Sequence, residues 1–336
     1  MAWRLRAAGK TVLVVGDSSA PCAASVAAGV INPVTGRWAV KSWQIENLLP
    51  EAAKTYRALE EELGIKIYHP IPLRRFCRNA DDLKRVGRRS RNPRYADVLG
   101  AVHAQGTGPV QLRDTNGSFD ILNAAYVDLP PLLEAMRSQF TANSAYHEGY
   151  FNHTKLKQDD ALLWNYESFN AKNVIFCEGA AVAKNPWFPD LPMTPIKGET
   201  LCFECPELEL PHSMYHNGKW LLPYRTGHFR LGATYNEADD SDGPTEFGKT
   251  VLLEGLNELL HSVPEIKIEQ QLAGMRPSTK DARPILGKHP EAAGIFILNG
   301  LGSKGTSLAP FLTLQFLNYL LDGAPFDSEI DLARFK

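Results

Sequence analysis

The sequence lacks the features that would place the protein in a membrane, outside the cell or on a nucleic acid. No apolar run approaches the roughly 20 residues of a membrane span, and the basic N-terminal segment is not followed by an apolar secretion core. The formal net charge is only −2, so no overall field would recruit nucleic acid or an anionic membrane. We therefore expect a cytoplasmic protein with no membrane partner.

Cysteine is also scarce. The five cysteines are scattered along the chain, which argues against a disulfide framework and fits a reducing compartment. Cys202 and Cys205 are close in sequence, but they lie in a strand-like pattern, where residues three apart point to opposite faces. No second pair or suitably spaced histidines accompany them, so we expect small buried side chains and no metal site.

What is present fits about two domains, since 336 residues with 44% hydrophobic positions can bury substantial cores. Segments typical of α/β units alternate with segments of short strands, so we expect a two-domain α/β (α+β) protein whose domains are interleaved. Helices are expected at 2–8, 47–63, 129–140, 249–262 and 307–321. Strands are expected at 11–15, 150–156, 161–166, 173–178, 199–204, 219–223, 228–234 and 295–298. Residues 65–120 gather Pro, Arg and Gly, as expected of strands and loops.

The first expected strand ends at Gly16 and Asp17 after a helix, the order found in the second half of a βαβ unit. Asp17 then has the position of the acid that hydrogen-bonds the ribose of a dinucleotide, although an ordinary turn aspartate is an equally good interpretation. The alternative that residues 16–21 form a degenerate G-x-G-x-x-G loop fails, because Ser18 and Pro21 replace two of the glycines and no helix follows.

Four segments make a more specific pattern. They are Ala24-Ser25-Val-Ala-Ala28-Gly29-Val-Ile-Asn-Pro33, Phe176-Cys-Glu-Gly179-Ala180, Ala273-Gly-Met-Arg276-Pro-Ser-Thr-Lys-Asp281-Ala-Arg-Pro-Ile-Leu-Gly287, and Asn299-Gly300-Leu-Gly302-Ser303-Lys304-Gly305-Thr306-Ser-Leu-Ala-Pro310. In order and spacing they resemble the FAD-dependent oxidoreductases of the D-amino-acid oxidase and glycine oxidase type, over about residues 2–323. The third segment is similar to that family's G-x-R-P-x-T-x-D-x-x-P-x-x-G signature and is the most specific.

The resemblance implies a Rossmann-like FAD/NAD(P)-binding domain at 1–64, 120–190 and 276–336, interleaved with an antiparallel-sheet substrate domain at 65–119 and 191–275. It also implies FAD as the cofactor. Small residues let backbone amides approach a diphosphate, and glycines before a long apolar helix expose a positive helix end. Tightly packed turns are the structural alternative. The implied cofactor-binding residues are Asp17, Ser25, Ala28, Gly29, Gly179, Ala180, Gly300, Gly302, Ser303, Lys304, Gly305 and Thr306.

Three residues are implied to meet the substrate. Arg276 lies at the family's carboxylate-binding position, and a guanidinium is a two-point receptor for a carboxylate; a structural ion pair with Asp281 is the alternative. Trp220 lies where glycine oxidase-like chains place an aromatic substrate residue, and core packing is an equal alternative. Lys304 stands where the glycine oxidase type carries a second arginine, so we expect the side-chain part of the substrate to be recognised by different contacts here.

The implied activity is oxidation of a small amine or amino acid by hydride transfer to flavin N5, with oxygen or another acceptor reoxidising the flavin. The nine histidines show no pairing pattern, and this chemistry needs no dedicated acid or base. The family's first strand and G-x-G-x-x-G loop are missing from the N-terminus, so we expect this chain as given to bind FAD weakly. A fold relative that no longer binds FAD is one alternative.

A further alternative comes from the dense basic run between Lys84 and Arg94. Such a run is usually a solvated loop, which we expect here, but it can also meet RNA phosphates. A related flavin domain belongs to a bacterial tRNA wobble-uridine modifying enzyme, which makes tRNA modification the runner-up function. We nevertheless expect a small-molecule substrate and no RNA binding.

Overall fold

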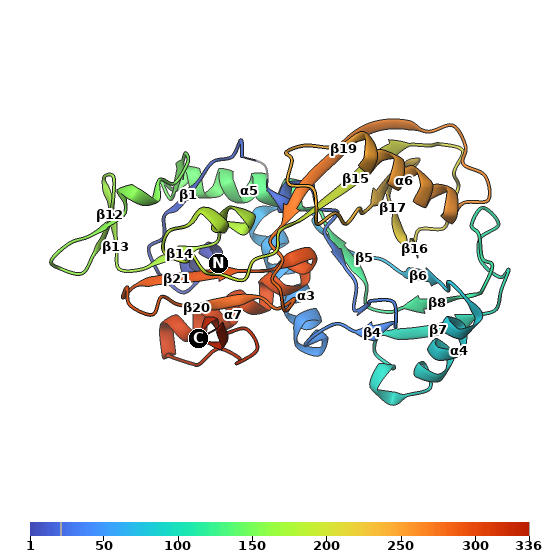
Figure 1. The fold of residues 1–336 in the computed structure, drawn as a ribbon, viewed down its shortest axis with the longest axis horizontal. Coiled ribbons are helices and arrows are strands. Elements are labelled where there is room, and N and C mark those ends of the chain that lie inside the picture. Colours follow the sequence, from blue (N-terminus) through green and yellow to red (C-terminus); the bar gives the residue numbers. More distant parts are fainter. Residues whose placement is uncertain (21, 336) are drawn as a thin grey trace. The chain divides into compact units, whose positions relative to one another are not determined.

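The computed structural model describes residues 1–20 and 22–335. The chain divides into two compact units, each assembled from stretches far apart in sequence (Figure 1). Unit 1 comprises Met1–Ser25, Pro130–Ile196 and Met275–Lys336. Unit 2 comprises Val26–Leu129 and Lys197–Gly274.

This division differs from the domain boundaries expected from the sequence. Residues 26–64 and 120–129 lie in unit 2, whereas the sequence analysis assigned them to the FAD-binding domain. The reason is a small antiparallel sheet in which β9 (Ala125–Val127) pairs with both β2 (Val30–Ile31) and β5 (Tyr68–Pro70). Helix α3 (Ile45–Leu63) packs against β5, so long-range pairing ties these residues to unit 2.

Short strands in three small sheets form the centre of unit 1. They are β1 (Val14–Gly16), β10 (Tyr146–Glu148), β11 (Lys157–Gln158), β12 (Trp164–Tyr166), β13 (Phe169–Ala171), β14 (Val174–Phe176), β20 (Ile285–Lys288) and β21 (Ile295–Asn299). β1 is parallel to β10, and β14 is parallel to β21, which pairs antiparallel with β20. Parallel neighbours need long crossover connections, so these pairs are the α/β part of the expected fold.

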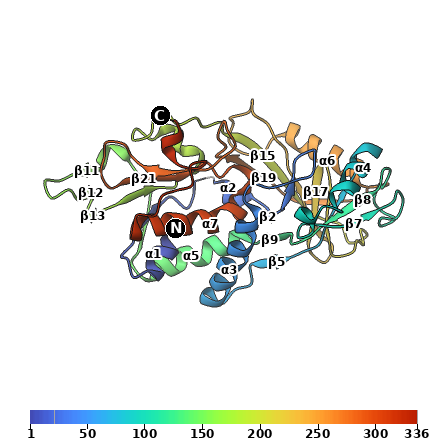
Figure 2. The ribbon, with the colours of Figure 1, turned by 90° about the horizontal axis from the view of Figure 1, so that it is seen from below.

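Three helices of unit 1 lie side by side, as Figure 2 shows. Arg4 donates from Nε to the Thr313 hydroxyl at 2.9 Å, and the Arg6 guanidinium lies 5.1 Å from the centre of the Phe140 ring. The helices are α1 (Ala2–Ala7), α5 (Leu129–Ala142) and α7 (Gly305–Asp322). Shorter 3-10 turns are η2 (His153–Lys155), η3 (Gly179–Lys184), η4 (Gly302–Lys304) and η5 (Leu332–Phe335).

An eight-stranded sheet dominates unit 2. In spatial order its strands are β19 (Lys267–Arg276), β15 (Ile196–Glu204), β18 (His228–Gly232), β17 (Lys219–Arg225), β16 (Met214–Asn217), β6 (Leu73–Phe76), β8 (Ser118–Ile121) and β7 (Leu99–His103). Helix α6 (Glu246–Leu259) packs against this sheet and buries Leu252, Leu256 and Leu259 with Leu201 and Leu231. The strands expected around residues 199–204, 219–223 and 228–234 are therefore confirmed.

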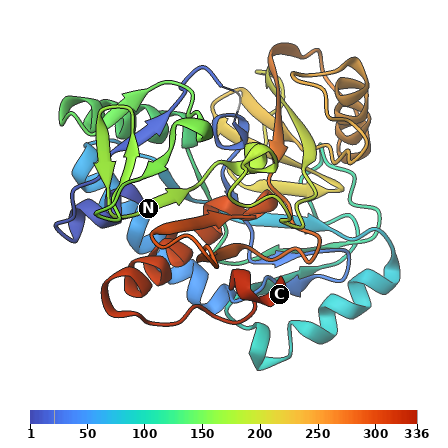
Figure 3. The same ribbon diagram turned by 60° about the vertical axis from the view of Figure 1, so that its left-hand side comes forward.

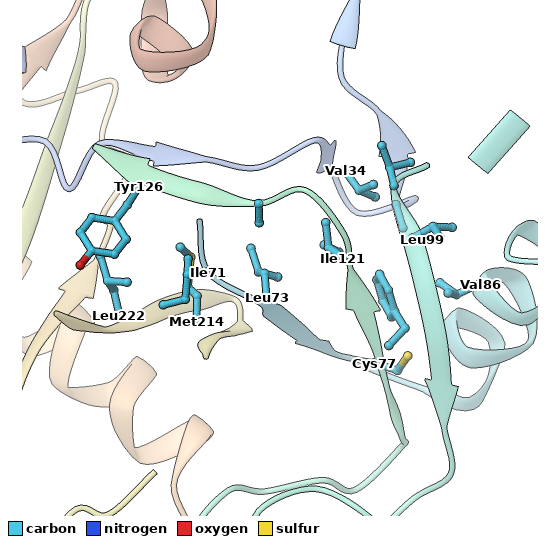
Figure 4. Packing of buried hydrophobic residues seen from close by; sticks show 14 of the residues in the cluster. Val34, Ile71, Leu73, Cys77, Val86, Leu99, Ile121, Tyr126, Met214 and Leu222 are labelled. Carbon is cyan, nitrogen blue, oxygen red and sulfur yellow. The ribbon is translucent and has the colours of Figure 1, made fainter. Parts of the chain in front are cut away.

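A second hydrophobic core of unit 2 draws on distant stretches of the chain (Figure 4). Leu73, Ile121 and Met214 come from neighbouring strands of the large sheet, and Tyr126 and Val34 come from the small sheets beside it. The remaining elements of this unit are α2 (Ala23–Val26), which begins in unit 1, β3 (Val34–Thr35), β4 (Val40–Lys41), α4 (Ala80–Arg89) and η1 (Pro93–Tyr95).

The expected solvated loop at Lys84–Arg94 is wrong, because its first half lies in helix α4. The Asn79 side chain caps this helix by accepting from the Asp82 amide at 2.9 Å, and Val86 is buried. Apolar periodicity missed the helix because Leu83 and Val86 are its only large apolar residues.

Some boundaries of the expected helices and strands differ from those in the structure. The helix expected at 47–63 ends where expected, since Gly64 follows α3 with a left-handed φ of 65°, but α3 begins two residues earlier, at Ile45. The strand expected at 11–15 begins only at Val14. The strand expected at 150–156 is wrong, because these residues contain the turn η2. The antiparallel strands β11, β12 and β13 are formed by later residues.

Candidate active site

One side chain ties together the ends of two parallel strands in unit 1. Asn299, at the end of β21, is 2% exposed; its Nδ2 donates to the Gly179 carbonyl at 2.9 Å, and its Oδ1 accepts from the Gly300 amide at 2.8 Å. Gly179 follows β14 and Gly300 follows β21, so both glycines lie at carboxyl ends of parallel strands, where open α/β sheets bind ligands. The sequence analysis named both glycines but missed Asn299.

The turn after β21 requires glycine for steric reasons. Gly300 and Gly302 have φ of 73° and 53°, and a Cβ at Gly300 would lie 2.8 Å from Thr279 Cγ2. A Cβ at Gly179 would meet no atom within 4 Å, and one at Gly302 would meet no atom closer than the Ser278 hydroxyl at 3.5 Å. Gly179 therefore borders open space, whereas a Cβ at Gly302 would be in ordinary contact with Ser278.

Helix α7 begins directly after this turn, at Gly305. With 18 residues it has a full helix dipole, and its N-cap residue Lys304 makes no side-chain capping hydrogen bond. Amides of the first turn and a positive helix end are suited to an anionic or electron-rich group. Ser303, Lys304, Gly305 and Thr306 all lie in this stretch, as the sequence analysis expected of a cofactor-binding segment.

The segment that carries Arg276 is hydrogen-bonded to the glycine turn. The Gly302 amide donates to the Pro277 carbonyl at 3.0 Å, and the Ser278 amide donates to the Arg276 carbonyl at 2.8 Å. The structure thus brings Arg276 and the glycine turn together in unit 1. Asp281, the alternative structural partner for Arg276, accepts from Arg334 Nε at 2.9 Å.

Lys304 is partly buried and lies near another cation, Arg283. Burial, and to a smaller degree the neighbouring Arg283, lowers the pKa of the Lys304 ammonium below its usual value. A lysine whose charge is destabilised in this way has a stronger tendency to bind an anion or to act as a neutral donor. Its position beside the helix N-terminus fits either use.

Asp17 is exposed and satisfies its own turn. It accepts from the Ser19 hydroxyl at 2.6 Å and from the Ser19 amide at 2.9 Å, and these hydrogen bonds lower the pKa of the Asp17 carboxyl. This geometry supports the turn-aspartate interpretation, although Asp17 does follow β1 as expected for a ribose acid. Ser25 donates to the Cys22 carbonyl at 2.9 Å. Pro21, which belonged to the rejected glycine-loop interpretation, lies outside the described residues.

Three other expected site residues lie in unit 2 and have clear packing roles. Gly29 has a φ of 66°, and a Cβ there would overlap the Val127 carbonyl, so packing alone requires glycine. Ala28 is buried in the core of Figure 4. Trp220 packs partly buried against the same core, with its ring over Gly232, which leaves no room for a side chain there.

Two absences can be stated for residues 1–20 and 22–335. Within them, no group of three or more His, Cys, Asp or Glu side chains could hold a metal ion. In the same part of the chain, no helix combines the length and apolarity needed to cross a membrane.

Comparison with known proteins gives matches to flavin enzymes. The family model "FAD dependent oxidoreductase" matches residues 1–312. Glycine oxidase of Bacillus subtilis (strain 168) is 32% identical over 116 residues, 34% of this chain and 31% of that protein. The tRNA 5-methylaminomethyl-2-thiouridine biosynthesis bifunctional protein MnmC of Caulobacter sp. (strain K31) is 28% identical over 329 residues, 93% of this chain and 51% of that protein. The chain thus spans about a third to a half of the length of these relatives.

Solved structures share the fold. Glycine oxidase from Geobacillus kaustophilus superposes with a TM-score of 0.78 at 22% identity, covering 96% of this chain and 90% of the other. Iminodiacetate oxidase from Chelativorans sp. BNC1 gives a TM-score of 0.77 at 23% identity, covering 98% and 94%. Together with the family match and the glycine turn before α7, these findings show that the chain belongs to the FAD-dependent oxidoreductases of the D-amino-acid oxidase family, with FAD as its cofactor.

Proposed function

We propose that the protein oxidises a small amine or amino acid that carries a carboxylate. The observation that carries the proposal is the hydrogen bond between the Gly302 amide and the Pro277 carbonyl, which fixes Arg276 next to the glycine turn. A bound FAD supplies two-electron oxidation of the carbon–hydrogen bond next to the amine. The protein itself must bind the substrate, orient it and exclude water.

The residues of unit 1 fit the isoalloxazine end of FAD. The first turn of α7 offers backbone amides directly after a turn whose glycines carry no side chains, and Gly179 leaves open space at the neighbouring strand end. Asn299 holds the two strand ends in register with each other. We assign Ala180, Ser303, Gly305 and Thr306 to the same cofactor-facing stretches, with Asp17 and Ser25 on the diphosphate and ribose side.

Arg276 is the residue that we assign to the substrate carboxylate. Its planar guanidinium makes two parallel hydrogen bonds to a carboxylate, which fixes the direction of the reacting carbon–hydrogen bond. We place Lys304 at the same site as a second cation. The substrate amine must be neutral to release electrons, and solvent can take up its proton.

The test compares a carboxylate-bearing amine with its decarboxylated counterpart. In FAD-loaded protein, Arg276→Lys should slow anaerobic flavin reduction by glycine far more than by methylamine, because lysine keeps the charge but loses the two-point grip. Loss of a charge-assisted hydrogen bond costs about 1.5–3 kcal/mol, or roughly one to two decades in the specificity constant.

The matched control is Arg334→Lys, which changes an arginine of unit 1 that pairs with Asp281. This control should affect both amines equally and mildly. Equal losses for glycine and methylamine in Arg276→Lys, with unchanged FAD content, would mean that Arg276 is structural.

A second candidate function is oxidation of an amine on a modified tRNA nucleoside. The observation that favours it is coverage: the relative whose name specifies tRNA 5-methylaminomethyl-2-thiouridine biosynthesis matches 93% of this chain, against 34% for glycine oxidase of Bacillus subtilis. This candidate would be favoured if the FAD-loaded protein released a carbonyl product from isolated tRNA but none from free amino acids.

A further inference from the structure

The cationic charge of the protein is concentrated on one surface of unit 2. We define the arginine surface as residues 36–41, the turn between β3 and β4, together with residues 75–97, which contain α4 and η1. These two segments hold ten basic and three acidic residues, a net charge of +7, although the whole chain carries −2. In Figures 1 and 3 helix α4 lies at an outer edge of unit 2, beside β7.

Three arginines of this surface are held in place by the β3–β4 turn. Arg75 donates to the Gly36 carbonyl at 2.8 Å, and Arg78 donates to the Arg37 carbonyl at 3.1 Å. Arg89 donates to the Ala39 carbonyl at 3.0 Å. Arg75 and Arg89 each use one of the five N–H donors of a guanidinium in this contact, whereas Arg78 also donates to Asp82.

A tryptophan lies between two further arginines on this surface. The guanidinium groups of Arg37 and Arg85 lie 4.2 and 4.3 Å from the centre of the Trp38 ring, and Trp38 is 46% exposed. Cation–π stacking of this kind orders exposed arginines without neutralising their charge. The surface is therefore ordered before any ligand arrives.

The acidic residues nearby neutralise only part of the charge. Asp82 pairs with Arg78 and Arg85, and Asp81 pairs with Lys84. Lys41 pairs with both Asp97 and Glu46 of α3. Among residues 1–20 and 22–335, no salt bridge is found for the six other arginines of the surface. They are Arg37, Arg75, Arg88, Arg89, Arg91 and Arg94.

The surface is hollowed next to these arginines. An open hollow of about 840 Å³ is lined by Arg89, Asn92, Arg94 and Tyr95 from the end of α4 and from η1. Lys41 also lines it, together with Glu46 and Asp97, the two carboxylates that pair with Lys41. Cations, an amide and an aromatic ring are the side chains that meet phosphate and unstacked bases.

We propose that the arginine surface binds the phosphate backbone of RNA. Eight of its ten basic residues are arginine, the side chain that grips phosphate oxygens at two points, and the exposed Trp38 and the partly buried Tyr95 lie among them. A membrane surface fits less well, because the apolar residues Leu83 and Val86 pack into the core of unit 2 and none is left on α4 to enter a bilayer. This inference goes beyond small-amine oxidation, and it supplies the RNA contact that the second candidate function requires.

The test measures RNA binding alone, so its outcome does not depend on any oxidation. Binding of a fluorescent tRNA to the FAD-loaded protein is followed by anisotropy at several salt concentrations. The exposed residues Arg88, Arg91 and Arg94 are replaced by alanine in one variant. The matched control removes three other exposed cations of unit 2, Lys54, Arg57 and Lys66, which lie on and just after α3.

Wild type and control should bind RNA with a steep salt dependence. In the arginine variant, affinity should fall about 10- to 100-fold at 0.1 M salt, and the slope of log affinity against log salt should flatten by about two to three. Absence of salt-sensitive binding in wild type, or equal losses in both variants, would overturn the proposal. Polyglutamate binding as tight as RNA with the same arginine dependence would also overturn it and indicate an acidic protein partner.

Discussion

The hydrogen bonds of Asn299 lead to a prediction about the integrity of the site. Replacing Asn299 by Leu removes the acceptor for the buried Gly300 amide and the donor to the partly buried Gly179 carbonyl. An unsatisfied buried polar group costs about 1–3 kcal/mol, and the Gly179 carbonyl can recover part of this from water. We therefore expect a loss of about 2–4 kcal/mol in the free energy of unfolding, a large part of the 5–15 kcal/mol typical of a domain.

Urea unfolding of the FAD-loaded protein measures this loss. The control is Asn143→Leu, because Asn143 is exposed and donates only to the Gln139 carbonyl of its own helix. This control should change the free energy of unfolding by less than about 1 kcal/mol. The Asn299 variant should also retain less FAD, since both glycine turns lose their shared support.

A second variant separates lost hydrogen bonding from altered packing. Asn299→Asp keeps nearly the same shape and the acceptor for Gly300, but an ionised carboxylate would face the Gly179 carbonyl. Burial raises the pKa of such a carboxyl, and its protonated form can donate again. The destabilisation should therefore shrink as the pH is lowered from 8 to 5. If Asn299→Leu and Asn143→Leu unfold at the same urea concentration, the role assigned to Asn299 is refuted.

Two further predictions concern unit 2. Gly29→Ala should destabilise by at least about 3 kcal/mol in urea unfolding, because the new methyl would overlap the Val127 carbonyl; Gly9→Ala, with a similar φ of 72° but nothing within 4 Å, should cost only about 1–2 kcal/mol. Burial, and then the nearby Arg75, lowers the pKa of His216 from 6.5 to about 4, so folding disfavours its protonation. The contribution of His216 to the free energy of unfolding should therefore fall by at most about 2 kcal/mol between pH 7 and pH 5. The His216→Gln variant should lose that much less free energy of unfolding over the same pH range. Equal acid sensitivity in the variant would count against the cause given.

Much of the fold could be predicted because its signals are local. Helix α7 is long and apolar, and α3 ends at a glycine in the left-handed region, so both are readable from neighbouring residues. Helix α4 was missed because it has little apolar periodicity, although its N-cap and the ion pairs around Asp82 are also local signals. The first strand of the antiparallel sheet β11–β12–β13 was predicted too early in the sequence, because short polar strands carry little periodicity.

The candidate site could be predicted in part for the same reason. The glycines around 300 and the Arg276 segment are motifs, and motifs keep their spacing in sequence. Asn299 was missed because its role depends on Gly179, 120 residues away, and the pairing of Asp281 with Arg334 spans 53 residues. Gly29 shows the opposite case, in which a glycine of a recognised segment also has a packing reason within its own unit.

The most direct test of the central claim is anaerobic reduction of the bound flavin by amines. FAD-loaded protein is mixed with glycine, with other small amino acids and with amines that lack a carboxylate, and the visible flavin absorbance is followed. We predict that carboxylate-bearing amines bleach the flavin, with one oxo acid and one ammonia formed per flavin after hydrolysis of the imine. If no small amine bleaches a flavin that dithionite fully reduces, the proposed small-amine oxidation is contradicted.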